Sequence, residues 1–195
     1  MAQIKLKDVR LSFPELWTAK PFNNDSNSKP AFNAAFLFPK GGDVHKLVSA
    51  TIQQVARESL GAEWEKQLSA LKAQDRLCLR DGDIKSEYEG YEGMMYLSSR
   101  SYVRPTVKDK DGKTPLLAED GRPYGGCYVN AIVDIWYQSA KSGYGQRINA
   151  GLSGVQFLRD GDAFTGTGGL PENAFEDLSN LGQAAPAGDG LDGLL

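Results

Sequence analysis

The chain has 195 residues, of which 41% are hydrophobic and 24% are charged, and this composition indicates one globular domain while excluding a fibrous or wholly disordered protein. The formal net charge of −3 argues against a nucleic-acid partner until the charges are placed along the chain. Apolar runs fall far short of the roughly 20 residues of a spanning helix, and the first residues lack a signal-peptide core. We therefore expect a cytoplasmic protein with no membrane partner.

The first predicted elements are two neighbouring strands. Apolar side chains alternate along residues 3–13, and a change of phase near Asp8 predicts a bulge. Pro14 is expected to end this strand, and the polar residues 21–30 to form a loop. Residues 32–38 then carry apolar side chains at a period of two, which predicts a second strand beside the first.

A helical insert is predicted next. Asp43 is placed to cap a helix in which apolar side chains keep a period of 3.6 up to about Gly61. A second helical piece follows at residues 64–72, with its apolar side chains on one side. Residues 77–83 predict a short strand that runs into an Asp-Gly turn, and residues 88–93 a glycine-rich loop.

Residues 94–107 predict a strand whose two faces differ. One face carries apolar side chains, among them Leu97 and Val103. The opposite face carries Tyr96, Arg100, Tyr102 and Arg104. Aromatic rings interleaved with guanidinium groups suit a surface on which bases stack while cations follow the phosphates. The alternative is an ordinary amphipathic strand, because Tyr and Arg are also common on exposed sheet surfaces.

Further strands are predicted after residue 107. A charged turn at residues 108–112 and a loop lead to the longest predicted strand, residues 127–138. A turn at 141–145 precedes a last strand, residues 146–158, with a bulge at Gly154. Bent, glycine-marked strands interrupted by one helical insert predict a mainly β protein. With five or six such strands, we expect a small Greek-key barrel of the OB-fold type rather than a sandwich.

The composition changes at Gly161 to Gly, Ala, Pro and Asp, which predicts a barrel domain at residues 1–160 and a disordered tail at 161–195. The tail has six acids and no Lys or Arg, so 22 basic residues face 19 acidic ones in the body, an excess of three positive charges. The tail ends in alternating acids and leucines that could bind a partner protein. These residues are Asp189, Leu191, Asp192, Leu194 and Leu195. The alternative is a tail that only confers solubility.

Other aromatic and basic residues lie on predicted strands and turns. They are Lys5 and Lys7 on the first strand, Trp136 on the longest strand, and Lys141, Tyr144 and Arg147 around the last turn. An exposed ring that stacks on a base contributes about 1–3 kcal/mol with little sequence preference. Together with the face described above, these residues predict a general single-strand binder.

The sequence lacks the residue combinations that common catalytic mechanisms use. His45 is the only histidine and stands in no nucleophile motif, and the two cysteines are expected to be reduced thiols rather than metal ligands or a disulfide. The segment Leu-Arg-Asp-Gly-Asp occurs twice, and we interpret both copies as turns. A weaker alternative is a metal nuclease that uses Asp81, Asp83, Asp160 and Asp162. We expect no enzyme, no cofactor and no bound metal.

Six short blocks occur in a distinctive order. They are LSFPEL at 11–16, FLFPK at 36–40, LRDGD at 79–83, RPTV at 104–107, YGGCYV at 124–129 and VQFLRDG at 155–161. Their order and spacing resemble the bacteriophage single-stranded-DNA-binding proteins of OB-fold type, which share their plan with the T7-type protein. The resemblance covers residues 1–162. It implies a five-stranded barrel that binds single-stranded DNA without sequence preference and without catalysis.

The same resemblance implies that the acidic tail contacts replication or recombination proteins. It leaves homo-oligomerisation open. A competing interpretation is a non-catalytic phage assembly or interaction protein with a β-barrel body and a docking tail. Salt-dependent binding to single strands separates the two interpretations, because only the first predicts it.

Overall fold

The computed structural model describes residues 1–21 and 28–164. Its strands are β1 Ala2–Lys20, β2 Ala31–Pro39, β3 Leu79–Asp81, β4 Met94–Ser101, β5 Thr106–Lys108, β6 Tyr128–Gln138 and β7 Arg147–Arg159. Helices α1 Asp43–Leu60 and α2 Trp64–Ala73 lie between β2 and β3. Short 3₁₀ turns occur at Gly61–Glu63, Gly82–Lys85, Ala118–Asp120 and Ala140–Ser142. The prediction of a mainly β protein with one helical insert is confirmed.

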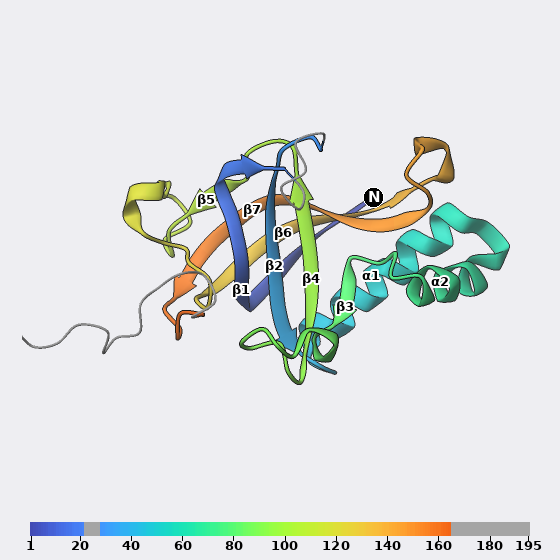
Figure 1. The fold of residues 1–195 in the computed structure, drawn as a ribbon, viewed down its shortest axis with the longest axis horizontal. Helices are drawn as coiled ribbons and strands as arrows, with labels where there is room; N and C mark the ends of the chain where they lie inside the picture. Colours follow the sequence, from blue (N-terminus) through green and yellow to red (C-terminus); the bar gives the residue numbers. More distant parts are fainter. Residues whose placement is uncertain (22–27, 165–195) are drawn as a thin grey trace, which may run out of the picture.

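Five of these strands form a closed barrel (Figure 1). β1 pairs antiparallel with both β2 and β6, β2 pairs with β4, and β6 pairs with β7. A parallel contact between β4 and β7, where Arg100 lies opposite Gly151, completes the circle. This is the predicted OB-type Greek-key barrel. The short strands β3 and β5 extend the sheet beside β4 and β7 respectively.

The barrel core follows from the alternation of side chains along its strands. Each barrel strand contributes fully or almost fully buried apolar side chains, for example Leu6, Phe36, Leu97, Val133 and Leu152. Burying a side chain of this size contributes about 1.5–3 kcal/mol relative to leaving it in water. The two-residue period that predicted the strands therefore also selects the residues that hold the barrel together.

The helical insert packs beside the barrel (Figure 1). Val48 and Val55 on α1 join the main core cluster. The predicted cap at Asp43 is wrong, because Gly42 occupies the N-cap position and no side chain caps the helix. Asp43 is instead the first helical residue, where its negative charge interacts favourably with the positive end of the helix dipole. Among the described residues no helix combines the length and the apolar content needed to cross a membrane.

β1 is longer than predicted because it bends twice. Asp8 and Phe13 both have positive φ, 50° and 46°, and the predicted bulge near Asp8 is confirmed by a register shift against β6. The prediction that Pro14 ends the strand is wrong. The pairing of β1 with β2 is interrupted between Ser12 and Glu15. Pro14 therefore lies at an irregularity, where the N–H that proline lacks is not needed for a hydrogen bond between the strands.

The strand predicted at residues 94–107 is divided into β4 and β5. The Ser101 hydroxyl donates to the carbonyl of Val103 and accepts from its N–H, which turns the chain after β4. Val103 is consequently 76% exposed rather than part of the core. Tyr102 and Arg104 lie on this turn, between the two strands, instead of on a regular sheet face.

Candidate nucleic-acid interface

The outer face of β4 is covered along its first half. Tyr96 points to this outer side and is only 1% exposed. Leu37 of β2, Tyr91 of the β3–β4 connection and Phe164 beyond β7 pack around it. The prediction that Tyr96 offers an exposed ring is wrong, because this second apolar cluster covers it. Burial also raises the pKa of the Tyr96 hydroxyl.

The other end of β4 is open and carries a ring flanked by cations. Tyr102 is 58% exposed, with the Lys29 ammonium 4.5 Å and the Arg100 guanidinium 5.5 Å from its ring centre. Arg100 also donates to the Lys29 carbonyl at 2.8 Å, which links β4 to the β1–β2 connection. The Arg104 guanidinium lies 5.3 Å from the Trp17 ring centre. Such a group can stack on a base and contact phosphates together.

A second basic group is an arginine cluster, which we define as Arg76, Arg80 and Arg147. Partial burial lowers the pKa of Arg147, and the positive charges of Arg76 and Arg80 lower it further. Asp75 pairs with Arg80 at 2.7 Å. These four residues together carry two more positive than negative charges. This excess of positive charge is suited to an anion such as phosphate, which guanidinium groups bind through paired hydrogen bonds.

The β6–β7 hairpin brings further predicted residues beside the arginine cluster. It projects beyond the barrel over the helices (Figure 1). Arg76 donates to the Tyr144 carbonyl at 3.0 Å, which holds the turn of the hairpin. Tyr144 is 80% exposed, and Lys141 is exposed on the same turn. Trp136 is half-buried near the end of β6.

Several residues of these groups lie on the surface that OB-folds generally use for binding. The face of the second and third barrel strands, together with the loops after the first and fourth, binds oligonucleotides. Here those strands are β2 and β4, and the loops are residues 21–30 and 139–146. Lys29 lies on the first loop and Tyr144 on the second, whereas residues 22–27 lie outside the described residues.

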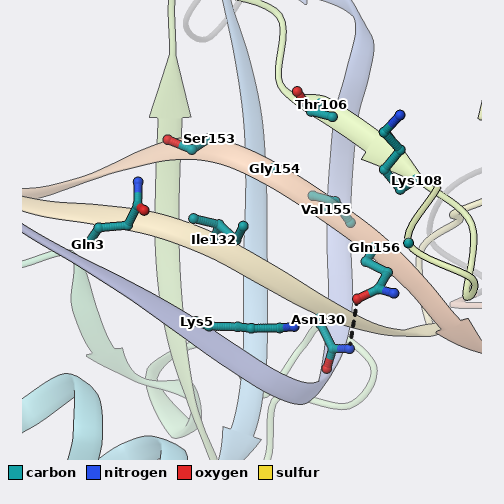
Figure 2. Close-up of a pocket in the computed structure, with 11 residues that line it drawn as sticks. Gln3, Lys5, Thr106, Lys108, Asn130, Ile132, Ser153, Gly154, Val155 and Gln156 are labelled. Carbon is teal, nitrogen blue, oxygen red and sulfur yellow. Dashed lines mark hydrogen bonds between the residues drawn. The ribbon is translucent and has the colours of Figure 1, made fainter. Parts of the chain in front are cut away.

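The other two predicted cations lie elsewhere. Lys5 and Lys7 are on β1, which is not adjacent to β4 in the barrel. Lys5 lines a separate hollow of about 370 Å³ over β1, β6, β7 and β5 (Figure 2). Lys7 is exposed and is not among the residues that line this hollow.

The sequence interpretation missed Trp17, Lys29, Arg76 and Arg80. Arg76 directly precedes the predicted strand 77–83 and Arg80 lies within it, and these two arginines four residues apart were the available signal. Trp17 and Lys29 carried no such signal, because their partners Arg104 and Tyr102 are distant in sequence.

An exposed aromatic pair was also missed. Phe13 and Tyr88 are each 41% exposed, and their rings meet edge to face at 5.2 Å. The segment 81–92 around Tyr88 carries five acids and one lysine. Its negative charge disfavours DNA phosphates, so we leave this pair out of the interface.

The aspartates of the repeated segment serve as turn and pairing residues. Asp81 accepts from the Asp83 N–H and begins the 3₁₀ turn that follows, which confirms the turn interpretation there. Lys40 pairs with both carboxylates and lowers their pKa values. Asp160 accepts a hydrogen bond from the Tyr124 hydroxyl at 2.9 Å. Within residues 1–21 and 28–164, no three Asp, Glu, His or Cys side chains gather as a metal site would require.

Residues 2–185 match a protein family described as "Enterobacter phage Enc34, ssDNA-binding protein". The chain belongs to this family. The predicted resemblance to phage single-stranded-DNA-binding proteins is thereby confirmed. A relative of the Enc34-type chain, protein p50 of Acyrthosiphon pisum secondary endosymbiont phage 1, is 44% identical over 183 residues, which are 91% of this chain and 94% of p50.

Two solved structures place the Enc34-type barrel among known folds. The bacteriophage Enc34 single-stranded DNA-binding protein, solved in complex with ssDNA, is 30% identical with a TM-score of 0.67 over 83% of this chain and 88% of that chain. The single-stranded DNA-binding protein gp2.5 of bacteriophage T7 is 12% identical with a TM-score of 0.55 over 89% of this chain and 99% of that chain. The T7 likeness concerns the fold alone.

The predicted tail falls almost wholly outside the described residues. Residues 161–164 still contact the barrel, and Phe164 is buried there. The predicted partner-binding residues Asp189, Leu191, Asp192, Leu194 and Leu195 all lie outside the described residues.

Proposed function

We propose that this chain binds single-stranded DNA without sequence preference. The observation that carries the proposal is the open end of β4, where the Lys29 and Arg100 cations lie within 4.5 and 5.5 Å of the centre of the exposed Tyr102 ring. Family membership supports it, and so does the Enc34 protein, which is 30% identical and was solved with ssDNA. Rings and cations without a pattern of base-reading amides suit a binder that accepts every sequence.

The proposed interface runs from the arginine cluster, past Arg100, to Tyr102 at the open end of β4. Phosphates contact the arginine cluster and Arg100, while bases stack on Tyr102 and on the exposed Tyr144. Arg104, Trp136 and Lys141 flank this track and contribute to it. Because affinity then comes chiefly from phosphate contacts, it falls as salt rises.

The proposed role is to protect and organise single-stranded DNA in phage replication or recombination, in the cytoplasm of the bacterial host. The protein acts by binding alone and catalyses no reaction. The acidic tail recruits replication or recombination proteins through its leucines and acids, from Asp189 to Leu195. Its negative charge also competes with DNA for the basic interface, which weakens binding in the full chain.

Binding of a fluorescent oligo-dT tests the proposal. The full chain is expected to bind it at low salt, and a variant without about the last 15 residues is expected to bind more tightly, because a competing negative segment is gone. Absence of binding by both forms at low salt contradicts the proposed function. Equal affinity of the two forms contradicts only the competition by the tail.

A further inference from the structure

The hollow that contains Lys5 is separate from the β4 face. It opens on the outer side of β1, β6 and β7, and β5 forms one wall (Figure 2). Its volume of about 370 Å³ lies within the range of small-ligand sites, about 300–1,000 Å³. The residues that matter here are Lys5, Lys108, Asn130, Ile132, Ser153 and Gln156.

A bulge in β7 shapes the floor of the hollow. Ile132 of β6 pairs with Gly154, whereas the next residue pairs with Leu152, so Ser153 is an extra residue in β7. This confirms the bulge predicted at Gly154. A side chain at Gly154 would meet the Thr106 carbonyl of β5 at 3.2 Å. The glycine therefore lets β5 approach closely, and β5 stands as a wall beside the floor.

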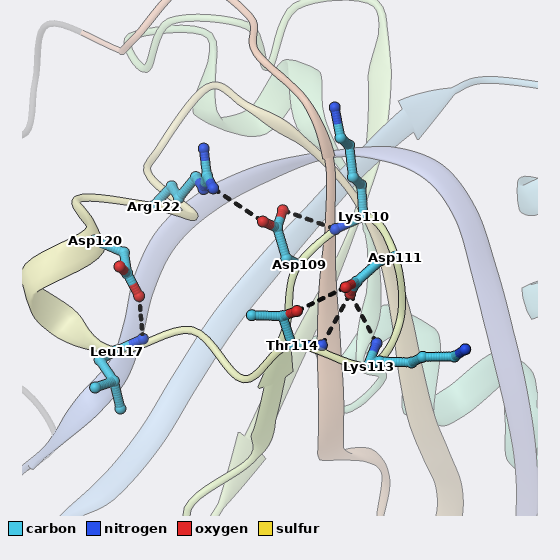
Figure 3. A network of polar contacts seen from close by, with 8 residues as sticks. All are labelled: Asp109, Lys110, Asp111, Lys113, Thr114, Leu117, Asp120 and Arg122. Atoms are coloured by element: carbon cyan, nitrogen blue, oxygen red, sulfur yellow. Dashed lines mark hydrogen bonds and ion pairs between the residues drawn. The ribbon is translucent and has the colours of Figure 1, made fainter.

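The turn after β5 is held rigidly by polar contacts (Figure 3). The Asp111 carboxylate accepts from the N–H groups of Lys113 and Thr114 and from the Thr114 hydroxyl. These bonds lower the pKa of Asp111. Gln156 donates to the Lys110 carbonyl at 3.1 Å and ties the turn to β7. The wall is thus preorganised before any ligand arrives.

Charge in the hollow is positive. Among the described residues that line it, Lys5 and Lys108 are the ones with a charge, and they lie on either side of β6 and β7 (Figure 2). The nearby Asp134 carboxylate accepts hydrogen bonds from Gln3 and Ser153. Ile132 is 40% exposed on the floor between the lysines. Two cations beside an apolar floor suit a ligand with phosphates and a flat base.

The hollow also begins close to the end of the proposed interface that contains Arg100 and Tyr102. Ser153 stands two residues beyond Gly151, which lies opposite Arg100, and Thr106 stands two residues beyond Arg104. We propose that the hollow is a second contact site for single-stranded nucleic acid, reached only by strands longer than those that fill the β4 face. Lys5 and Lys108 bind phosphates there, and a base lies on Ile132. This inference rests on the proposed function above.

Two oligonucleotide lengths and one double variant test the inference. Oligo-dT of about 8 and about 30 nucleotides are titrated against the full chain, because one OB-fold occludes about 4–16 nucleotides. Lys5→Gln with Lys108→Gln is compared with Lys46→Gln with Lys66→Gln, a matched loss of two charges at exposed positions of α1 and α2. Thermal unfolding confirms that each variant is folded.

For the double variant we expect unchanged binding of the short strand. With the long strand, the slope of log K against log salt should fall by about 1.4, since each lost phosphate contact removes about 0.7. An unchanged slope, or an equal loss for both lengths, overturns the inference. A labelled peptide of residues 186–195 is tested in parallel. If the lysine variants abolish its binding while the long-strand slope is unchanged, the hollow binds an acidic peptide and the inference is overturned.

These outcomes separate the inference from the proposed function. Failure of the unmodified chain to bind the short strand contradicts the proposed function itself. Normal short-strand binding with an unchanged long-strand slope contradicts only the second site.

Discussion

The guanidinium of Arg10 lies 4.3 Å from the ring centre of Phe164, so a residue of the first strand fastens the end of the described chain. Arg10 also donates to the carbonyls of Gly126 and Asp162. The ring of Phe164 rests on Gly90, where an added side chain would meet it at 2.7 Å. Phe164 thereby closes the apolar cluster over the outer side of β2 and β4.

Phe164→Ala is therefore expected to lower the free energy of unfolding by about 3 kcal/mol, because it leaves a cavity over Leu37 and Tyr96. Urea unfolding followed by fluorescence measures the change. Phe13→Ala is the matched control, since Phe13 is 41% exposed, and we expect a change within about 1 kcal/mol. Equal losses for the two variants would show that Phe164 does not pack as described.

Tyr102→Ala with Arg104→Ala is expected to weaken oligo-dT binding without unfolding the barrel. Both side chains are exposed on the turn between β4 and β5. Loss of one stacked base costs about 1–3 kcal/mol, a factor of about 5 to 150 in affinity. Anisotropy titration and thermal unfolding are the two measurements. A large drop in melting temperature would mean that these residues stabilise the fold instead.

Tyr96 is expected to behave in the opposite way. Tyr96→Ala should lower the free energy of unfolding by about 3–5 kcal/mol, since the ring is buried. Tyr96→Phe keeps the ring and should leave oligo-dT affinity unchanged. A Tyr96→Phe variant that stays folded but loses affinity would return Tyr96 to the DNA interface.

Both cysteines are expected to be unreactive in the folded protein. Burial raises the pKa of Cys78 to about 12 and that of Cys127 to about 11. Near pH 8 this lowers the thiolate fraction about a thousandfold for Cys78 and about a hundredfold for Cys127. Ellman's reagent should therefore react slowly with the native chain and rapidly in denaturant. Rapid reaction of the native chain would contradict the burial of both thiols.

The same raised pKa values set a pH dependence of stability. Below the ordinary thiol pKa of about 9, the thiol is neutral in both the folded and the unfolded chain, and its burial contributes fully to the free energy of unfolding. As pH rises from there towards about 12, the unfolded chain ionises first and this contribution is lost. Replacing Cys78 with Ala should flatten the decline in unfolding free energy above pH 9.

Strand positions could be predicted because side-chain alternation is local. The Phe-rich run of β2 and the apolar positions of β6 were found in this way, and the barrel followed from strand number and the helical insert. Pro14 was wrongly predicted to end β1. The strand accommodates this proline only because its pairing with β2 is irregular there, which is a tertiary feature. Val103 misled because the Ser101 hydroxyl turns the chain before the alternation reaches it.

The interface could be predicted only in part. Alternation correctly separates the Tyr96 side of β4 from the Leu97 side, but it contains no information on what covers that outer side. The cover comes from Tyr91 and from Phe164, which is 68 residues away from Tyr96 in the chain. Likewise Arg76 and Arg80 approach Arg147 only once residues 76–78, just before β3, pair with Ile148 at the start of β7.

The salt dependence of oligo-dT binding tests the central claim most directly. We compare the full chain with Arg80→Gln/Arg147→Gln, using Lys46→Gln/Arg57→Gln on α1 as the charge-matched control. The account predicts a linear fall of log K with log salt, with a slope about 1.4 smaller for the double variant, since two phosphate contacts are removed. No binding of oligo-dT by the full chain at low salt, or identical slopes for both chains, would contradict it.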